Sequence, residues 1–101
     1  MIVVTSVRLR LFPSGPRRVR AVGSIIIFGC FQIEHVHVVE REDGTLIVAM
    51  PSRFEMGKYH DVAHPITVES RAEIDRKVME KYQSEQARDL TENGKSATIA
   101  P

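Results

Sequence analysis

Cationic and aromatic side chains alternate within one stretch of the chain, "MPSRFEMGKYHD". Arg53, Lys58 and His60 supply positive or protonatable groups, and Phe54 and Tyr59 supply rings. Cations meet phosphates and aromatic faces stack on exposed bases, so this mixture is typical of a surface that binds a nucleic acid. The pattern also allows a second interpretation, in which both rings hold the segment against the core while Arg53 and Lys58 point to water.

The residues before this stretch predict how it is presented. "LIVAM" is an apolar run with the composition of a buried strand, and Pro51 follows it directly. Proline has no N–H to donate to a sheet and restricts the residue before it, so the strand must end there. We therefore expect a rigid strand that displays Ser52 and Arg53 at its tip.

The four histidines suggest a metal site that the sequence does not complete. His35 and His37 are two residues apart on an expected strand and share a face, whereas His60 and His64 lie in the connection that follows. A structural zinc site needs four ligands, and a catalytic one usually has three with supporting hydrogen bonds. No cysteine pair and no HExxH motif supplies the missing ligands. The sequence therefore predicts no metal.

No catalytic arrangement emerges either. Ser52 has no evident base beside it, and Glu40, Glu42 and Asp43 crowd an expected turn. The glycines are scattered and form no phosphate-binding loop. The single cysteine, Cys30, has apolar neighbours and no cation to generate a thiolate, so we expect a buried, unreactive thiol. These observations favour a protein that is not an enzyme and uses no cofactor.

The N-terminal third predicts a hairpin with a basic face. In "IVVTSVRLRLF" and "RRVRAVGSIIIF" apolar and polar residues alternate, which is typical of half-buried strands, and "PSGP" between them is a turn by composition. The alternation predicts that one face of the first strand carries Val3, Thr5, Val7, Leu9 and Leu11. The outer face of the hairpin then carries a possible accessory basic surface, made of Arg8, Arg10, Arg18 and Arg20.

The rest of the chain predicts a second hairpin, a loop and a helix. "FQIEHVHVVER" and "TLIVAM" flank "EDG", where Gly44 supplies a positive φ. Residues 51–65 are expected to form a long irregular connection. A capping box, Ser70-x-x-Glu73, begins an amphipathic helix that should end between Tyr82 and Leu90. The buried face of this helix is expected to carry Ile74, Val78 and Tyr82, with Met79 beside them.

This order of elements predicts an α+β fold: a four- to five-stranded antiparallel sheet followed by one C-terminal helix. With 101 residues, 43% of them hydrophobic, the chain has the size of one small domain, assigned to residues 1–90, followed by a disordered tail at 91–101. One helix covers only part of one sheet face, so the other face is either wet or covered by a second copy. The small core and the strands with apolar residues on both faces predict a homodimer. No signal peptide and no membrane-spanning run is evident, which favours a cytoplasmic protein without membrane insertion.

Charge is unevenly distributed along the chain. The formal net charge is only +1, but residues 1–33 contain five arginines and no acidic residue, whereas the remainder holds nine basic and thirteen acidic residues. The N-terminal third is therefore a cationic segment on a nearly neutral protein.

Four segments, in this order and spacing, carry a resemblance: "VTSVRLRLF", "LIVAMPSRF", "YHDVAHPI" and "RAEIDRKVMEKY". Together they resemble the SpoVG family (stage V sporulation protein G, also called septation protein) from Val3 to Tyr82. "VAMPS" followed by "DVAHPI" is the most specific part. The resemblance implies a small, dimeric, non-enzymatic bacterial cytoplasmic protein with an antiparallel sheet and a C-terminal helix. It further implies DNA and RNA binding linked to gene regulation, and roles in septum formation, sporulation or virulence.

The resemblance also implies where a nucleic acid would bind. The family's contact is placed at basic residues just after the Met-Pro-Ser turn, which corresponds to Arg53. Where the family usually has a second basic residue this chain has Phe54, and the loop is one residue shorter. Lys58 and His60 lie close enough to compensate in part, and Arg71, at the start of the helix, is a further candidate contact.

Two other function classes remain open from the sequence. One is a protein-interaction adaptor in cell division that recognises division or regulatory proteins and makes no direct contact with nucleic acid. Its support is the mixed apolar pattern of "FQIEHVHVV", which could serve a partner. The other, a small hydrolase or metalloenzyme, lacks a convergent set of residues.

Overall fold

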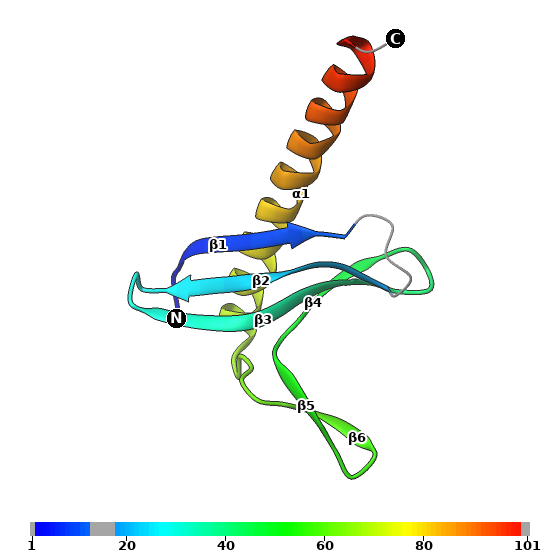
Figure 1. Cartoon of the computed structure of the whole chain (residues 1–101). Helices are drawn as coiled ribbons and strands as arrows, with labels where there is room; N and C mark the ends of the chain where they lie inside the picture. Colours follow the sequence, from blue (N-terminus) through cyan, green and yellow to red (C-terminus); the bar gives the residue numbers. More distant parts are fainter. Residues whose placement is uncertain (1, 13–17, 100–101) are drawn as a thin grey trace.

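The computed structural model describes residues 2–12 and 18–99, with side chains as far as residue 88. Its elements, in chain order, are β1 (Val4–Leu11), β2 (Val19–Ile27), β3 (Phe31–Glu40), β4 (Leu46–Ala49), β5 (Ser52–Glu55), β6 (Lys58–Asp61) and α1 (Val68–Ile99). The first four strands form one antiparallel sheet in the order β1-β2-β3-β4, and β5 and β6 pair separately (Figure 1). The predicted α+β class is confirmed, with four strands in the sheet. The predicted turn at 13–16 lies outside the described residues.

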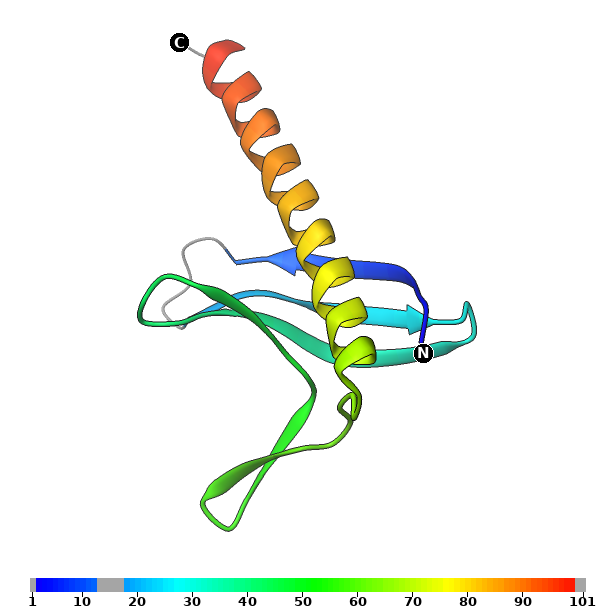
Figure 2. The ribbon, with the colours of Figure 1, turned by 180° about the vertical axis from the view of Figure 1, so that it is seen from behind.

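The helix covers one face of the sheet and leaves the other face open. The helix α1 lies behind the four strands in Figure 1 and in front of them in Figure 2, which shows the molecule from the opposite side. Its predicted apolar face is confirmed, because Ile74, Val78 and Tyr82 are buried and Met79 packs beside them. The buried residues that the sheet and the end of β4 contribute to this core are Val4, Ala21, Ile25, Val36, Val38, Val48 and Met50.

The start of β1 departs from the predicted alternation. Val4 is buried at 2% exposure, whereas Val3, expected on the core face, is 43% exposed and Thr5 is exposed as well. The pairing of β1 with β2 shifts register between Val4 and Ser6, and such a bulge reverses which residues face the core. Beyond it the prediction holds, since Val7, Leu9 and Leu11 pack against the core.

Gly23 occupies a place where two strands approach very closely. A Cβ added there would lie 1.7 Å from the Arg8 carbonyl oxygen and 2.9 Å from Leu9 Cα. Both neighbours are backbone atoms of β1, so no side chain can rotate away to make room. Glycine at this position therefore allows β1 and β2 to pair as they do.

The helix begins three residues earlier than its predicted capping box. Thr67 is the N-cap, because its Oγ1 accepts a hydrogen bond from the Ser70 amide at 3.1 Å, and the Thr67 amide in turn donates to Ser70 Oγ at 3.4 Å. The prediction that Ser70 and Glu73 form the box is thus wrong. Glu73 Oε2 instead accepts a hydrogen bond from the Val4 amide at 3.1 Å, and this bond ties the helix to β1.

This arrangement makes Glu73 sensitive to acid. The Val4 amide and the Arg76 guanidinium, 2.7 Å away, hold the pKa of Glu73 below its ordinary value of 4.5. In the unfolded chain the carboxyl takes up its proton at higher pH than in the folded protein. The contribution of Glu73 to stability is therefore complete above pH 4.5 and is lost as pH falls through the lowered folded-state pKa.

We expect Glu73→Gln to be less stable than the wild type near neutral pH and to approach it in acid. The measurement is urea-induced unfolding followed by circular dichroism from about pH 7 to about pH 3. Glu80→Gln is the matched control, because Glu80 pairs with the same Arg76 but contacts no backbone amide of β1. A stability difference between wild type and Glu73→Gln that stays constant across this range would contradict the assignment.

The helix also continues further than expected. It runs to Ile99, beyond the predicted end between Tyr82 and Leu90, because no proline interrupts the chain between Pro65 and Pro101. The assignment of a domain at 1–90 and a disordered tail at 91–101 stays a prediction. Within the described residues, no helix has the length and apolarity needed to cross a membrane.

The turn between β2 and β3 is exposed, which overturns the expectation of a buried thiol. Cys30 is exposed, as are Phe28 at 57% and Phe31 at 63%. Phe28 has a φ of 53° and Gly29 a φ of 67°. Phe28 and Phe31 therefore lie at the tip of a hairpin and do not cover Cys30, whereas Ile27, at the end of β2, packs against the core.

Candidate functional site

The segment after Pro51, predicted to be irregular, is a β-hairpin that projects from the sheet (Figure 1). Met56 and Gly57 form its two-residue turn with φ values of 51° and 79°. Positive φ at both positions is the pattern of a type I′ turn, whose twist matches that of paired strands. The Val62 amide donates a hydrogen bond of 2.7 Å to the Pro51 carbonyl and closes the base. The sequence signal was Gly57, whose freedom at positive φ suits a two-residue turn.

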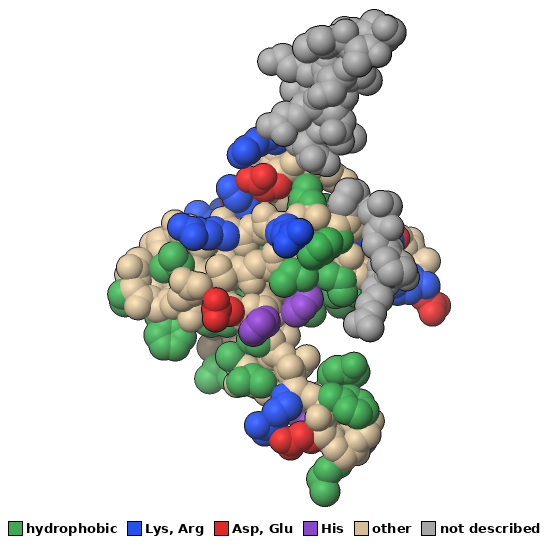
Figure 3. All heavy atoms as spheres, in the orientation of Figure 1, with side chains coloured by type: hydrophobic (Ala, Val, Ile, Leu, Met, Phe, Trp, Pro, Cys, Tyr) green, Lys and Arg blue, Asp and Glu red, His purple; other side chains and the backbone are tan. Residues whose placement is uncertain are grey.

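One face of the hairpin carries most of its charged or protonatable side chains, whereas Asp61 lies on the other face. Arg53 pairs across the strands with His60, and Glu55 pairs with Lys58. Because alternate residues of a strand point to the same side, these four groups share a face, which we call the charged face. Figure 3 shows positive and negative side chains together on one side of the projecting hairpin.

The opposite face carries the two rings. Phe54 pairs with Tyr59, and their ring centroids are 4.9 Å apart at an angle of 59°. Phe54 is 59% exposed and Tyr59 is 77% exposed, so the interpretation in which they hold the segment against the core is wrong. We call this pair the aromatic face. The hairpin thus separates the cations and rings that alternate in the sequence onto opposite sides.

Arg53 has a carboxylate partner but stays accessible. Its Nε lies 2.7 Å from Glu55 Oε1, and the two side chains are 69% and 49% exposed. An exposed ion pair of this kind contributes little and is screened by salt. A phosphate can therefore replace Glu55 as the partner of the guanidinium. Ser52, which opens β5, is also exposed and pairs across the hairpin with Asp61.

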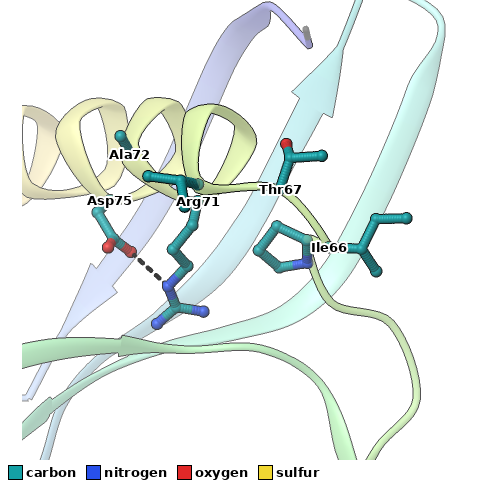
Figure 4. A pocket seen from close by; sticks show the side chains of 7 residues that line it. Ile66, Thr67, Arg71, Ala72 and Asp75 are labelled. Carbon is teal, nitrogen blue, oxygen red and sulfur yellow. Dashed lines mark ion pairs between the residues drawn. The ribbon is translucent and has the colours of Figure 1, made fainter.

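Arg71 does not join this group. Its Nη2 donates a hydrogen bond to the Val48 carbonyl, and its Nε lies 3.2 Å from Asp75 Oδ1 (Figure 4). The Asp75 oxygen is buried and accepts no hydrogen bond from the described residues, so this ion pair lacks hydrogen-bond alignment. The bond to Val48 joins α1 to β4, which gives Arg71 a structural part. Its predicted role in binding stays a prediction.

The four arginines of the predicted accessory basic surface are divided between different surroundings. Arg8 and Arg10 are exposed on the open face of the sheet, opposite the core-facing residues of β1. Arg20 lies with its Nη2 3.6 Å from Glu40 Oε2. Arg18 lines a hollow beside the acidic turn between β3 and β4. The structure therefore leaves Arg8 and Arg10 exposed and gives Arg20 an acidic partner.

The described residues contain no group of three or more His, Cys, Asp or Glu side chains placed to hold a metal ion. His35 and His37 lie in β3, His60 lies in β6, and His64 bonds with its Nδ1 to the neighbouring Pro65 carbonyl. The sequence did not reveal that His35 has a φ of 61°. This residue lies where the pairing of β2 with β3 shifts register.

A model of the SpoVG family matches residues 2–84, which include the sheet, the hairpin and the buried part of α1. The chain belongs to the SpoVG family. The resemblance drawn from the four motifs is thereby confirmed. The matched residues include both the charged face and the aromatic face.

Individual relatives agree with this assignment, and those compared below are each named "Putative septation protein SpoVG". The relative from Phytoplasma australiense is 38% identical over 81 residues, covering 79% of this chain and 82% of its own length. The one from Caldicellulosiruptor bescii is 37% identical over 82 residues, covering 80% and 91%. The one from Lachnospira eligens is 40% identical over 81 residues, covering 79% and 90%.

Proposed function

We propose that this SpoVG-family chain is a homodimeric regulator that binds DNA or RNA through the charged face of the β5–β6 hairpin. Through this binding it would act in septation, sporulation and gene regulation. The observation that carries the proposal is a projecting two-stranded ribbon with Arg53 and Lys58 exposed on one side. A ribbon of two strands has the dimensions that the major groove of B-DNA admits.

The side chains of the charged face favour the nucleic-acid backbone over base edges as the point of contact. Arg53 offers a planar fork that matches phosphate geometry, and Lys58 offers a mobile point charge. His60 lies across from Arg53 and adds a further donor, whereas Ser52 precedes Arg53 in β5 and lies on the opposite face of the hairpin. Phosphate contacts hold a polymer without reading its sequence, so we expect strong salt dependence and little base discrimination.

The homodimer has its own support in the hairpin. Met56 at the turn is fully exposed, both rings of the aromatic face are more than half exposed, and Val62 at the base is 67% exposed. An isolated two-stranded hairpin is marginally stable in water, so a surface that covers these apolar groups would stabilise it. We propose that a second copy supplies that surface. A twofold dimer would then present two charged faces to one polymer.

The test is a fluorescence-anisotropy titration of duplex DNA and of RNA at several salt concentrations. Arg53→Ala is expected to weaken binding to unrelated sequences alike, and to reduce the slope of log K against log[salt] by about 2 in a dimer that uses both hairpins. Glu55→Gln is expected to strengthen binding, because it removes the competing carboxylate.

Arg41→Ala is the matched control, since it removes the same charge from the exposed turn between β3 and β4. Equal losses from Arg53→Ala and Arg41→Ala would show that net charge alone matters and that the hairpin is not the site. A folded wild-type protein that binds neither DNA nor RNA would refute the proposal altogether.

One observation favours a second candidate, the division adaptor. Phe28 and Phe31 are exposed at the β2–β3 turn, and Phe28 holds a positive φ that bulky residues rarely adopt. Such a surface suits a protein partner. Capture of a division protein that survives nuclease treatment and Arg53→Ala, but is lost in Phe28→Ser, would support the adaptor over the nucleic-acid regulator.

A further inference from the structure

The open face of the sheet, opposite α1, carries arginine and histidine side chains in two rows. In the first row, strand register places Arg10 beside Val22, Val22 beside His37 and His37 beside Ala49. Neighbouring strands are about 4.8 Å apart, so the backbones of Arg10 in β1 and His37 in β3 are about 10 Å apart across β2. Figure 3 views this face and shows histidines near its centre with positive side chains beyond them.

The second row contains a strained residue. Arg8 pairs with Ser24, and Ser24 lies where the β2–β3 register skips from Gly23 to Ile25, opposite Glu34 and His35. His35 has a φ of 61° and is exposed. A non-glycine residue rarely adopts this conformation, and such a residue is often retained for what its side chain does. Because Ile33 and Val36 both face the core, this bulge directs His35 away from it.

The described acidic side chains of this face do not form ion pairs with the two arginines of β1. Among the ion pairs of the described residues, none includes Arg8 or Arg10. Arg10 is positioned over the Phe12 ring, 5.6 Å from its centroid. Glu34, at the bulge, is the acidic side chain beside His35, whereas Glu40 is paired with Arg20 at the far end of β3. The β1 edge of this face is therefore cationic.

We propose that the open sheet face binds a single-stranded nucleic acid, with Arg8 and Arg10 on its phosphates and His35 and His37 against its bases. This inference rests on the proposed function for the nature of the ligand, but it assigns a second site, and that site takes single-stranded nucleic acid. The two arginines are alternate residues of one strand, about 7 Å apart along β1, and can follow successive phosphates of an extended chain.

The shape of the open sheet face favours a single-stranded nucleic acid over a duplex. A single strand can lay its unstacked bases across an open sheet, where imidazole rings and apolar side chains such as Val22 offer contact. A duplex keeps its bases stacked inside and presents only its backbone to a broad sheet. The projecting hairpin, in contrast, can enter a groove. The two surfaces should therefore respond differently to the same pair of oligonucleotides.

The test compares one oligonucleotide as a single strand and as a duplex, by fluorescence anisotropy with the full chain. The double variant Arg8→Gln/Arg10→Gln is expected to lose about tenfold or more in single-strand affinity and less than about threefold in duplex affinity. Arg53→Ala/Lys58→Ala is expected to lose more duplex affinity than single-strand affinity. The two double variants remove the same number of charges, so each controls for the other.

Two single variants separate base contact from charge. His37→Ala is expected to weaken single-strand binding by about fivefold or more, and His37→Phe to restore most of it, because a phenyl ring preserves the stacking face. Glu34→Gln is expected to strengthen binding. Circular dichroism and sedimentation confirm that each variant keeps the fold and association state of the wild type.

The outcomes separate this inference from the proposed function. If the wild type binds duplex but not single strands, or if Arg8→Gln/Arg10→Gln weakens both alike, the sheet-face site is refuted while the hairpin site stands. A shift of that variant towards the monomer would refute it too, since the face would then be a contact between copies. If the wild type binds neither ligand, both proposals fail.

Discussion

Gly23→Ala is expected to lower the free energy of unfolding by about 3 kcal/mol, at the upper end of what overpacking usually costs. The added methyl group would overlap the Arg8 carbonyl oxygen, and relief requires the paired backbones of β1 and β2 to move apart. Since small domains are stable by only about 5–15 kcal/mol, the change removes a large share. The measurement is the urea midpoint, followed by circular dichroism.

Gly29→Ala is the matched control, because it adds the same methyl group at a site with no atom within 4 Å. Gly29 has a φ of 67°, so this substitution is expected to cost about 1–2 kcal/mol from the left-handed backbone alone. A Gly23→Ala variant as stable as Gly29→Ala would show that β1 and β2 do not approach as closely as described.

Phe54→Asp is expected to convert the proposed homodimer largely to monomer at micromolar concentration. Burying one phenylalanine side chain contributes about 1.5–3 kcal/mol, and twofold symmetry removes that contribution twice. The total of about 3–6 kcal/mol corresponds to a rise in the dimer dissociation constant of about 100-fold to 10,000-fold. Sedimentation equilibrium over a range of protein concentrations measures this change.

Lys58→Gln is the comparison, because it alters the charged face of the same hairpin and leaves the aromatic face intact. It is expected to keep the dimer and to weaken nucleic-acid binding. If the wild type is monomeric, or if Phe54→Asp associates as strongly as the wild type, a second copy does not cover the aromatic face. The rings would then remain available to stack on bases, as the sequence pattern predicts for Phe54.

The elements that could be predicted are those whose pattern reflects one local rule. Alternation identified β1 and β2, the "EDG" turn located the β3–β4 hairpin, and four-residue spacing identified the buried face of α1. The hairpin after Pro51 was missed because its strands are only four residues long and exposed on both faces. Without a buried side there is no apolar alternation to detect.

The misplaced capping box shows a second limit. Thr67 and Glu73 both offer capping chemistry to Ser70, and the sequence does not say which one is used. The choice depends on Val4, sixty-nine residues from Glu73, whose amide takes the carboxylate as its acceptor. Arg71 was treated as a surface cation for the same reason, because its bond to the Val48 carbonyl joins segments that are distant in the chain.

By itself, the sequence determined the α+β class, the helix face and the SpoVG resemblance, all of which depend on residue types at short spacing. Tertiary structure alone decided which side chains share a surface. It placed Arg53 and Phe54 on opposite faces of a hairpin, and it left Arg8 and Arg10 exposed while pairing Arg20 with Glu40. The physical reason is that strand register and bulges determine where each side chain points, and a shift of one residue reverses that direction.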